Sequence, residues 1–338
     1  MPTRHFDSHD KILLLQHGST ELLALAQRRG VELHKLLSGT SIFEQDLQRP
    51  HGRLHHADWL KLLQNCQHQL KSPELPFLLG SAMLNSRYIA VCQSLQFAKN
   101  LKQALCHLYY FRHQLFPGFY VRLSQQNEHL IIEFKAAVDL GPQHAFMLTI
   151  LCSLLLNLIK QQLGSLAGVR LQVQHSCSQH QLWGCDLAIL QPCDSLSIPL
   201  DLLQKKFADA EPVQFKAARR TCRQLNHVLI KQRGVLESIC RLQQRALPLL
   251  LSQEQVAAAL GLSHSTLKRV LSRHDTNFAR LIDEVRRDAA RNLLQQGQYS
   301  NRQLALKLGY SDEHNFRRAF KRWTGLIPSS FKGMFHFN

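Results

Sequence analysis

Apolar residues recur at helical spacing in the first part of the chain, and this spacing predicts three amphipathic helices. The first is expected at about 19–38, with Ser19 or Thr20 as its cap and Gly30 as an interruption. The second and third are expected at about 56–70 and about 97–115.

The period of the pattern changes near residue 120. Apolar runs at 120–123 and 130–134 flank a polar segment, Gln125-Gln126-Asn127-Glu128, which predicts a β-hairpin. An apolar helix is expected next at about 143–162, followed by strands at 169–173 and 195–198. Helices and strands mixed in this order predict an α+β fold for the first two-thirds of the chain.

Beyond about residue 201 the pattern predicts no further strand. Residues 207–234 are polar and basic, and we interpret them as a linker that is helical in part. Every segment after Val235 is helical in pattern and is broken by short turns. We therefore expect an α+β domain at 1–206, a linker at 207–234 and an all-α domain at 235–338.

Within the all-α domain, residues 253–273 have the pattern of a helix-turn-helix unit. A short helix ends near Leu260, and Gly261 can adopt the left-handed conformation that terminates a helix. Ser263 is expected to cap the next helix, and Ala257 is small enough for two helices to cross closely. This second helix should bury Leu267, Val270 and Leu271 and expose His264, Ser265, Lys268, Arg269 and Arg273.

The same pattern recurs at residues 300–322. Ser300 is expected to cap a short helix, Gly309 to stop it, and Ser311 to cap a second helix that runs from Asp312 through Trp323. The apolar face of this second helix should hold Phe316, Ala319, Phe320 and Trp323, with Asn315, Arg317, Arg318, Lys321 and Arg322 elsewhere around it.

A helix expected at about 277–296 joins the two units and would be ~30 Å long. Successive major grooves on one face of B-DNA lie ~34 Å apart. One chain can therefore present both second helices, at about 264–273 and 312–323, to two successive major grooves of double-stranded DNA. The predicted fold is an α+β sensing domain plus an all-α domain with two helix-turn-helix units on a long helix.

The charge of the chain agrees with a polyanionic partner, either nucleic acid or an anionic membrane surface. The net charge is +17 and the pI is about 9.8. Residues 240–338 hold 16 Lys/Arg and 7 Asp/Glu, a net of +9. The longest apolar stretch, Ala145–Ile159, is too short to span a bilayer, and the spacing of the two units favours DNA over membrane.

The second unit carries a resemblance to a known family. Its run from Leu308 to Gly325, LGYSDEHNFRRAFKRWTG, followed by Pro328, resembles the DNA-binding domain of the AraC family of transcription regulators. The first unit matches through Val256-Ala257, Leu260-Gly261-Leu262-Ser263, Thr266-Leu267 and Arg269. In the order of its elements, the region of about 20–205 resembles the arabinose-binding-type regulatory domain of one branch of this family, and not a cupin barrel.

This resemblance implies a transcription regulator whose N-terminal domain senses an unknown small-molecule effector and mediates homodimerisation. It also implies activation more often than repression, through contact with RNA polymerase. Ser265 stands where the family often has Arg, so a bidentate guanine contact is not expected there. Asn301 replaces a usually apolar residue, and Lys332 replaces a frequent Arg.

The residues that we predict to meet DNA are polar residues of the two second helices. Lys and Arg side chains should anchor phosphates and set most of the affinity. Arg322 serves either DNA or an intramolecular ion pair, and Glu313 either favours the helix dipole or accepts from cytosine N4. Residues expected at or near base edges are Ser265, Lys268, Arg269, Asn315 and Arg318. The full set is His264, Ser265, Thr266, Lys268, Arg269, Arg273, Glu313, His314, Asn315, Arg317, Arg318, Lys321 and Arg322.

Metal and catalytic sites are the competing interpretations. The sequence contains no Cys-x-x-Cys pair, and it has none of the common hydrolase, metalloprotease or phosphate-loop motifs. We therefore expect no metal, no cofactor and no enzyme activity. The groups considered for metal binding are His51, His55 and His56, and Cys177, Cys185 and Cys193 with nearby His175 and His180.

Two alternative functions stay open. The chain is alternatively a DNA-binding cysteine sensor or methyl-acceptor protein of the repair type, or a DNA-binding protein that needs no ligand. Its nine cysteines are odd in number and irregularly spaced, and its start is polar. These features indicate reduced thiols and a cytoplasmic location.

Overall fold

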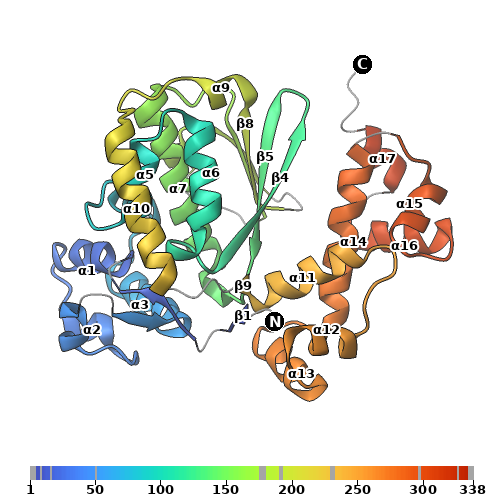
Figure 1. Ribbon diagram of the computed structural model, residues 1–338, viewed down its shortest axis with the longest axis horizontal. Coiled ribbons are helices and arrows are strands. Elements are labelled where there is room, and N and C mark those ends of the chain that lie inside the picture. Colours follow the sequence, from blue (N-terminus) through green and yellow to red (C-terminus); the bar gives the residue numbers. More distant parts are fainter. Residues whose placement is uncertain are drawn as a thin grey trace. The chain divides into compact units, whose positions relative to one another are not determined.

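The chain folds into two compact units, and each is described by itself (Figure 1). The N-terminal unit is Phe6–Arg233, and the C-terminal unit is Gly234–Asn338 together with Met1–His5. The computed structural model describes residues 5–7, 10–15, 17–49, 52–174, 180–189, 193–228, 233–295, 298–325 and 327–333.

The N-terminal unit begins with short elements. They are β1 (His5–Phe6), β2 (Lys11–Leu14), α1 (Ser19–Gln27), α2 (Leu33–Leu37), the 3-10 turn η1 (Glu44–Gln48), β3 (Arg53–His55) and α3 (His56–Leu70). The helix predicted at about 19–38 is divided into α1 and α2, because the chain turns at Gly30, where φ is 82°. Gly18 caps α1, so the prediction of Ser19 or Thr20 is wrong. Ser19 lies inside the helix, and its hydroxyl donates to the carbonyl of Leu15.

A layer of helices forms the body of this unit. They are α4 (Leu75–Leu84), α5 (Ala90–Gln96), α6 (Leu101–Phe111), η2 (Arg112–Gln114), η3 (Gly141–Gln143), α7 (His144–Leu163), α8 (His180–Trp183), α9 (Leu200–Gln204) and α10 (Pro212–Val228). α4 packs closely on α7, because Gly80 has no side chain to hold the backbones apart. The hydroxyl of Ser153 on α7 joins the two helices by donating to the carbonyl of Phe77 at 3.0 Å.

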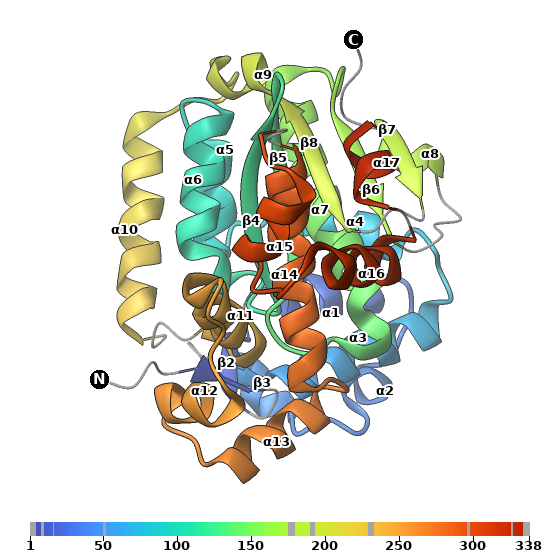
Figure 2. The ribbon, with the colours of Figure 1, turned by 90° about the vertical axis from the view of Figure 1, so that its right-hand side faces the viewer.

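A mixed sheet forms the other layer, with α5, α6, α7 and α10 on one side of it (Figure 1). Its strands are β4 (Phe119–Gln126), β5 (His129–Ala136), β6 (Arg170–Val173), β7 (Asp186–Ile189) and β8 (Ser195–Pro199). The spatial order is β4-β5-β8-β6-β7, with only β6 and β7 parallel among these described strands, as Figure 2 shows. The predicted hairpin is present, and its turn holds Asn127 at a φ of 49°.

The apolar helix α7 is the centre of the N-terminal core. With the turn before it, Gly141–Leu163 is long and apolar enough to cross a membrane, so the prediction that it is too short is wrong. Burial gives the better reason for a core helix, because 72% of its apolar window is buried inside the unit. A helix that is apolar all round is buried in a large core or in a bilayer, and here the core surrounds it.

Most of the segment expected to be a linker is α10. Phe215, Ala218 and Cys222 of this helix are buried, and α10 packs along α5. The sequence predicted a linker because the exposed face of this helix is basic. The few apolar residues on its other face were too sparse to indicate a packed helix. β9 (Arg233–Gly234) is a strand beyond residue 201, where none was predicted, and two residues are too few to leave a readable period.

Apart from His5 of β1 and Gly234 of β9, the regular secondary structure in the described residues of the C-terminal unit is helical. Its helices are α11 (Val235–Ala246), α12 (Gln253–Leu260), α13 (His264–Arg273), α14 (Phe278–Gln295), α15 (Asn301–Lys307), α16 (Glu313–Thr324) and α17 (Pro328–Gly333). Two small cores share α14. Leu281 and Val285 join its first half to α11, α12 and α13, whereas Ala290 and Leu294 join its second half to α15 and α16.

Candidate nucleic-acid interface

The first helix-turn-helix unit is built from local signals that the sequence shows directly. The hydroxyl of Ser252 accepts from the amide of Gln255, whose side chain accepts in turn from the amide of Ser252, so that α12 begins with a capping box. Gly261 ends α12 with a φ of 69°, as predicted. The amide of Leu262 then donates to the carbonyl of Ala257 at 2.9 Å, which closes the turn.

The recognition helix of this unit, α13, divides its residues as the sequence predicts. Ser263 caps it by accepting from the amide of Thr266 at 3.0 Å. Leu267, Val270 and Leu271 are buried in the first small core. The exposed residues include His264, Ser265, Lys268, Arg269 and Arg273.

Two of the predicted residues on α13 have partners within the unit. The imidazole Nε2 of His264 lies 3.4 Å from a carboxylate oxygen of Glu254 on α12. The hydroxyl of Ser265 lies 3.0 Å from that of Ser263, the capping residue. Both side chains are therefore held at the N-terminal end of α13.

The second helix-turn-helix unit repeats the first 48 residues later (252 to 300, 257 to 305, 261 to 309). Ser300 and Gln303 form the capping box of α15. The amide of Tyr310 donates to the carbonyl of Ala305 at 2.9 Å, and Gly309 has a φ of 74°. The two turns therefore use the same hydrogen bond and the same left-handed glycine.

The repeat breaks at the start of the second recognition helix, α16. Ser311 was expected to cap it, but the cap is Asp312, whose carboxylate accepts from the amide of Asn315 at 2.7 Å. The helix therefore runs from Glu313 to Thr324, one residue later than predicted. Serine and aspartate cap equally well, so the order of the two residues could not be decided from propensity. The amide of Asn315 also lowers the pKa of Asp312, because it stabilises the carboxylate.

The polar side chains of the first turn of α16 form a network. The amide Nδ2 of Asn315 donates to Asp312 at 2.7 Å, and Nη2 of Arg318 donates to Oδ1 of Asn315 at 2.9 Å. Nδ2 of Asn301 on α15 donates to a carboxylate oxygen of Glu313 at 3.3 Å. This bond gives a structural reason for the polar residue where the family usually has an apolar one.

The remaining cations of α16 fall into two groups. Arg317 and Lys321 are exposed, one turn apart, while Phe316 and Phe320 beside them are buried. Nη2 of Arg322 instead lies 2.8 Å from a carboxylate oxygen of Asp283 on α14. The intramolecular ion pair considered for Arg322 is therefore present.

Arg286 on α14 holds the turn of the second unit, a role that sequence reasoning missed. Its Nε donates to the carbonyl of Leu308 at 3.1 Å, and its Nη2 donates to that of Gly309 at 3.2 Å. Its guanidinium lies 4.5 Å from the ring centroid of Tyr310. At Gly309 a side chain would clash with the carbonyl oxygen of Pro248. The segment between α11 and α12 therefore approaches the turn of the second helix-turn-helix unit closely. No local pattern reveals a contact between residues 22 positions apart.

Metal binding and cysteine chemistry gain no support from the described residues. Among them, no group of three or more His, Cys, Asp or Glu side chains is placed to hold a metal ion. His51, His175 and Cys177 lie outside the described residues. Burial raises the pKa of Cys185 to about 11, so its thiol stays protonated and weakly nucleophilic at neutral pH.

Comparisons with known proteins agree with this geometry. Residues 256–334 match the helix-turn-helix domain family. Residues 30–207, more than half of the chain, match the family described as the N-terminal arabinose-binding domain of AraC transcription regulators. The matched families and relatives are transcription regulators, not enzymes.

Two relatives and one solved structure, all from Pseudomonas aeruginosa, illustrate the similarity. The ornithine utilization regulator is 26% identical over 317 residues, which cover 92% of this chain and 94% of the relative. The regulator VqsM is 28% identical over 142 residues, 41% of this chain and 44% of VqsM. The crystal structure of the regulator CdpR is 20% identical and covers 93% of this chain and 97% of its own, with a TM-score of 0.44.

These matches confirm the predicted fold class and the predicted family. They also agree with the two repeated turns, the capped recognition helices and the basic surface of the C-terminal unit. The chain belongs to the AraC family of transcription regulators, with an N-terminal effector-binding domain and a C-terminal DNA-binding domain.

Proposed function

We propose that the chain inserts α13 and α16 into two successive major grooves of double-stranded DNA. The observation that carries this proposal is that both helices pack against one helix, α14, through the two small cores. α14 has 18 residues and is therefore ~27 Å long. Successive major grooves on one face of the duplex are ~34 Å apart, so a single spacer helix of this length suits both contacts.

Exposed cations on the two recognition helices are assigned to the phosphates. Arg317 and Lys321 are exposed on the side of α16 away from its core, and Arg273 ends α13. Phosphate contacts provide most of the affinity and make it dependent on salt. Arg322 has a positioning role through Asp283, because that ion pair fixes α16 against α14.

The first two turns of both recognition helices are assigned to base edges. Arg318 reaches the groove with its guanidinium held by Asn315, which reduces the entropy lost on binding. The residues assigned at or near bases are Ser265, Lys268, Arg269, Asn315 and Arg318, with His264, Thr266, Glu313 and His314 at the rims of the same turns.

The proposal extends to the manner of regulation. The chain acts as a homodimer in the cytoplasm and activates transcription by contacting RNA polymerase, under control of a small-molecule effector. Support comes from the similarity along nearly the whole chain to a protein named a regulator of ornithine utilization. An effector acts by binding one arrangement of the domains more tightly than another.

Selection of genomic DNA by the purified chain tests the two-groove proposal. Fragments should be enriched from few promoter regions, and footprints should protect roughly two helical turns, ~20 base pairs, for each chain. Protection of a single groove would contradict the role of the second recognition helix. Binding that is weak, uniform along the DNA and lost with salt would contradict sequence-specific recognition.

A pair of alanine positions in α12 supplies the matched control. Ala257 is buried beneath α13, whereas the next residue, Ala258, is exposed. Ala257→Glu should abolish the footprint by placing a charge between two close helices, and Ala258→Glu should retain it. Wild-type affinity in a folded Ala257→Glu variant would exclude the first helix-turn-helix unit from the interface.

A further inference from the structure

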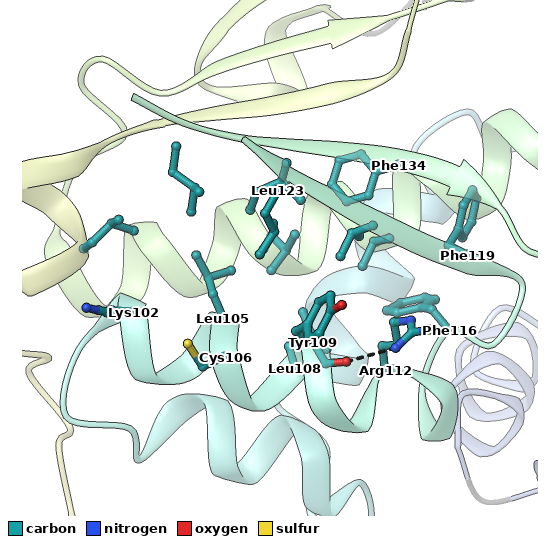
Figure 3. A pocket seen from close by; sticks show the side chains of 16 residues that line it. Lys102, Leu105, Cys106, Leu108, Tyr109, Arg112, Phe116, Phe119, Leu123 and Phe134 are labelled. Carbon is teal, nitrogen blue, oxygen red and sulfur yellow. Dashed lines mark hydrogen bonds between the residues drawn. The ribbon is translucent and has the colours of Figure 1, made fainter. Parts of the chain in front are cut away.

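An apolar cavity that is partly open to solvent lies in the N-terminal unit, between α6 and the β4–β5 hairpin (Figure 3). Its volume is about 310 Å³. Leu151 and Leu155 of the core helix α7 also line it, so the cavity reaches into the body of the unit. Because the cavity is partly open, a ligand can reach its apolar walls from solvent, and concave, mostly apolar pockets of this size are typical of small-molecule sites.

The sheet wall of the cavity arises from strict alternation. On β4 and β5 every second residue faces the cavity, and the register pairs Val121 with Phe134 and Leu123 with Ile132. Leu123 is 53% exposed and Tyr109 on α6 is 38% exposed, although both line an apolar space. The residues on this wall are Phe119, Val121, Leu123, Leu130, Ile132 and Phe134.

Two cations mark the ends of this cavity, Lys102 on α6 and Arg112 directly after it, and Figure 3 shows them on opposite sides of the apolar residues. Ten residues of helix separate them by ~15 Å. Arg112 donates to the carbonyl of Tyr109 at 3.2 Å and lies 5.5 Å from the centroid of its ring. Lys102 is exposed, and the described residues that line the cavity include neither Asp nor Glu.

We propose that this cavity is the effector site and that it takes a fatty-acid-class amphiphile, a single medium-length hydrocarbon chain with a carboxylate that pairs with Lys102. The inference rests on the effector-binding role of the N-terminal domain and names the ligand class for it. Burying hydrocarbon against these walls contributes roughly 25 cal/mol for each Å² removed from water. If each carbon atom of the hydrocarbon chain occupies roughly 30 Å³, as a water molecule does, about ten carbon atoms fill the cavity.

A sugar does not suit this site, although the matched domain family is named for arabinose. Every hydroxyl of a buried sugar needs a hydrogen-bond partner, and an unpaired one costs roughly 1–3 kcal/mol. The polar side-chain groups that line the cavity are those of Lys102, Cys106, Tyr109 and Arg112, all on one helix or directly after it. The side chains that the sheet and α7 contribute to the cavity are all apolar and cannot form hydrogen bonds with a sugar.

Binding of decanoate to the full-length chain tests the proposal. Calorimetry below the critical micelle concentration should show saturable binding of one decanoate per chain. Decanol should bind more weakly than decanoate, and arabinose should not bind. Shorter and longer acids, hexanoate and hexadecanoate, should bind at least tenfold more weakly than decanoate. Saturable arabinose binding without decanoate binding, or decanoate that only lowers the melting temperature, would overturn the assignment.

Two variants locate the ligand within the cavity. Lys102→Ala should weaken decanoate about tenfold and leave decanol unchanged, whereas Lys99→Ala, an exposed lysine outside the cavity, should change neither. Leu123→Asp should weaken both ligands, because it places a charge on the wall without disturbing the fully buried core. Binding that none of these variants changes would place decanoate elsewhere.

The footprint on DNA separates failure of this inference from failure of the proposed function. A specific footprint that decanoate never alters, together with no decanoate binding, refutes the ligand class and leaves DNA recognition intact. Absence of any specific site, with or without decanoate, refutes the proposed function instead. Dimerisation that blocks the cavity would assign these apolar walls to a second copy of the chain and overturn the ligand site.

Discussion

In the C-terminal unit, the proposed DNA contacts come from two helices of 10 and 12 residues, each with its own cap and its own preceding turn. In the N-terminal unit, the proposed effector cavity collects residues from Lys102 to Leu203, on α6, β4, β5, α7 and α9. The proposed DNA contacts therefore come from short runs of consecutive residues. The proposed cavity forms only after segments that are distant in the sequence have packed together.

The cores of the two units differ in the same way. The N-terminal unit has one large core around α7, while the C-terminal unit has two small cores that share α14. A small core has few contacts to lose, so single turn and capping interactions should matter more in the C-terminal unit. Close helix packing should matter more in the N-terminal unit.

The largest effect is expected at Gly80 in α4. A Cβ atom there would lie 2.6 Å from the carbonyl oxygen of Ile150 and 2.9 Å from Cβ of Ser153, so Gly80→Ala must push α4 away from α7. The free energy of unfolding of the N-terminal unit should fall by about 3 kcal/mol. Hydrogen exchange, read separately for the two units, measures this change, and Ser81→Ala is the control. An equal loss in both units would show that the two cores are not independent.

A smaller effect is expected at Gly309 in the C-terminal unit. Gly309→Ala combines the strain of a φ of 74° with a clash against the carbonyl of Pro248, and should cost about 2 kcal/mol. Gly325 has the same φ of 74° but open space around it, so Gly325→Ala should cost only about 1 kcal/mol. Thermal melting of the two variants isolates the clash. Equal melting temperatures would mean that the approach to Pro248 is not tight.

Acid should weaken the N-terminal unit through His107. Burial, with Arg219 and Arg223 nearby, lowers the pKa of this side chain to about 4. The unfolded chain, with a pKa of about 6.5, binds the proton more readily, so stability is full above pH ~6.5 and falls as the pH drops toward 4. Between pH 7.5 and 5 the loss should be about 1–2 kcal/mol. Denaturant unfolding of His107→Gln should show a flatter dependence on pH, and an unchanged dependence would assign the effect to other groups.

The smallest effect is expected on the recognition surface itself. Arg317→Ala should weaken DNA binding about tenfold at every sequence and flatten the slope of log K against log salt by about 1. Stability should stay unchanged, because the side chain is exposed. Arg245→Ala on α11 removes another exposed cation, outside the recognition helices, and should leave the slope as it is. Titrations at several salt concentrations measure both, and an unchanged slope for Arg317→Ala would remove it from the interface.

Much of the C-terminal unit could be predicted from the sequence because its signals are short-range. Ser263, Ser300 and Gly261 were assigned correctly, since a cap or a left-handed turn depends on residues three or four positions away. Where two neighbours were equally suitable, as Ser311 and Asp312 are, the assignment failed by one residue. Arg286 was missed because its partners lie on another helix.

The sequence by itself determined the two recognition helices, the cap of the first one, their buried faces and the family of the chain. Periodicity and capping reflect interactions between residues a few positions apart, so they can be recognised in the sequence without knowledge of the fold. Only the tertiary structure decided that 212–228 packs on the N-terminal core, that Arg322 pairs with Asp283, and that a cavity separates α6 from the hairpin. Each of these features depends on segments that meet only after folding. Packing between distant segments produces no pattern within a short stretch of the sequence.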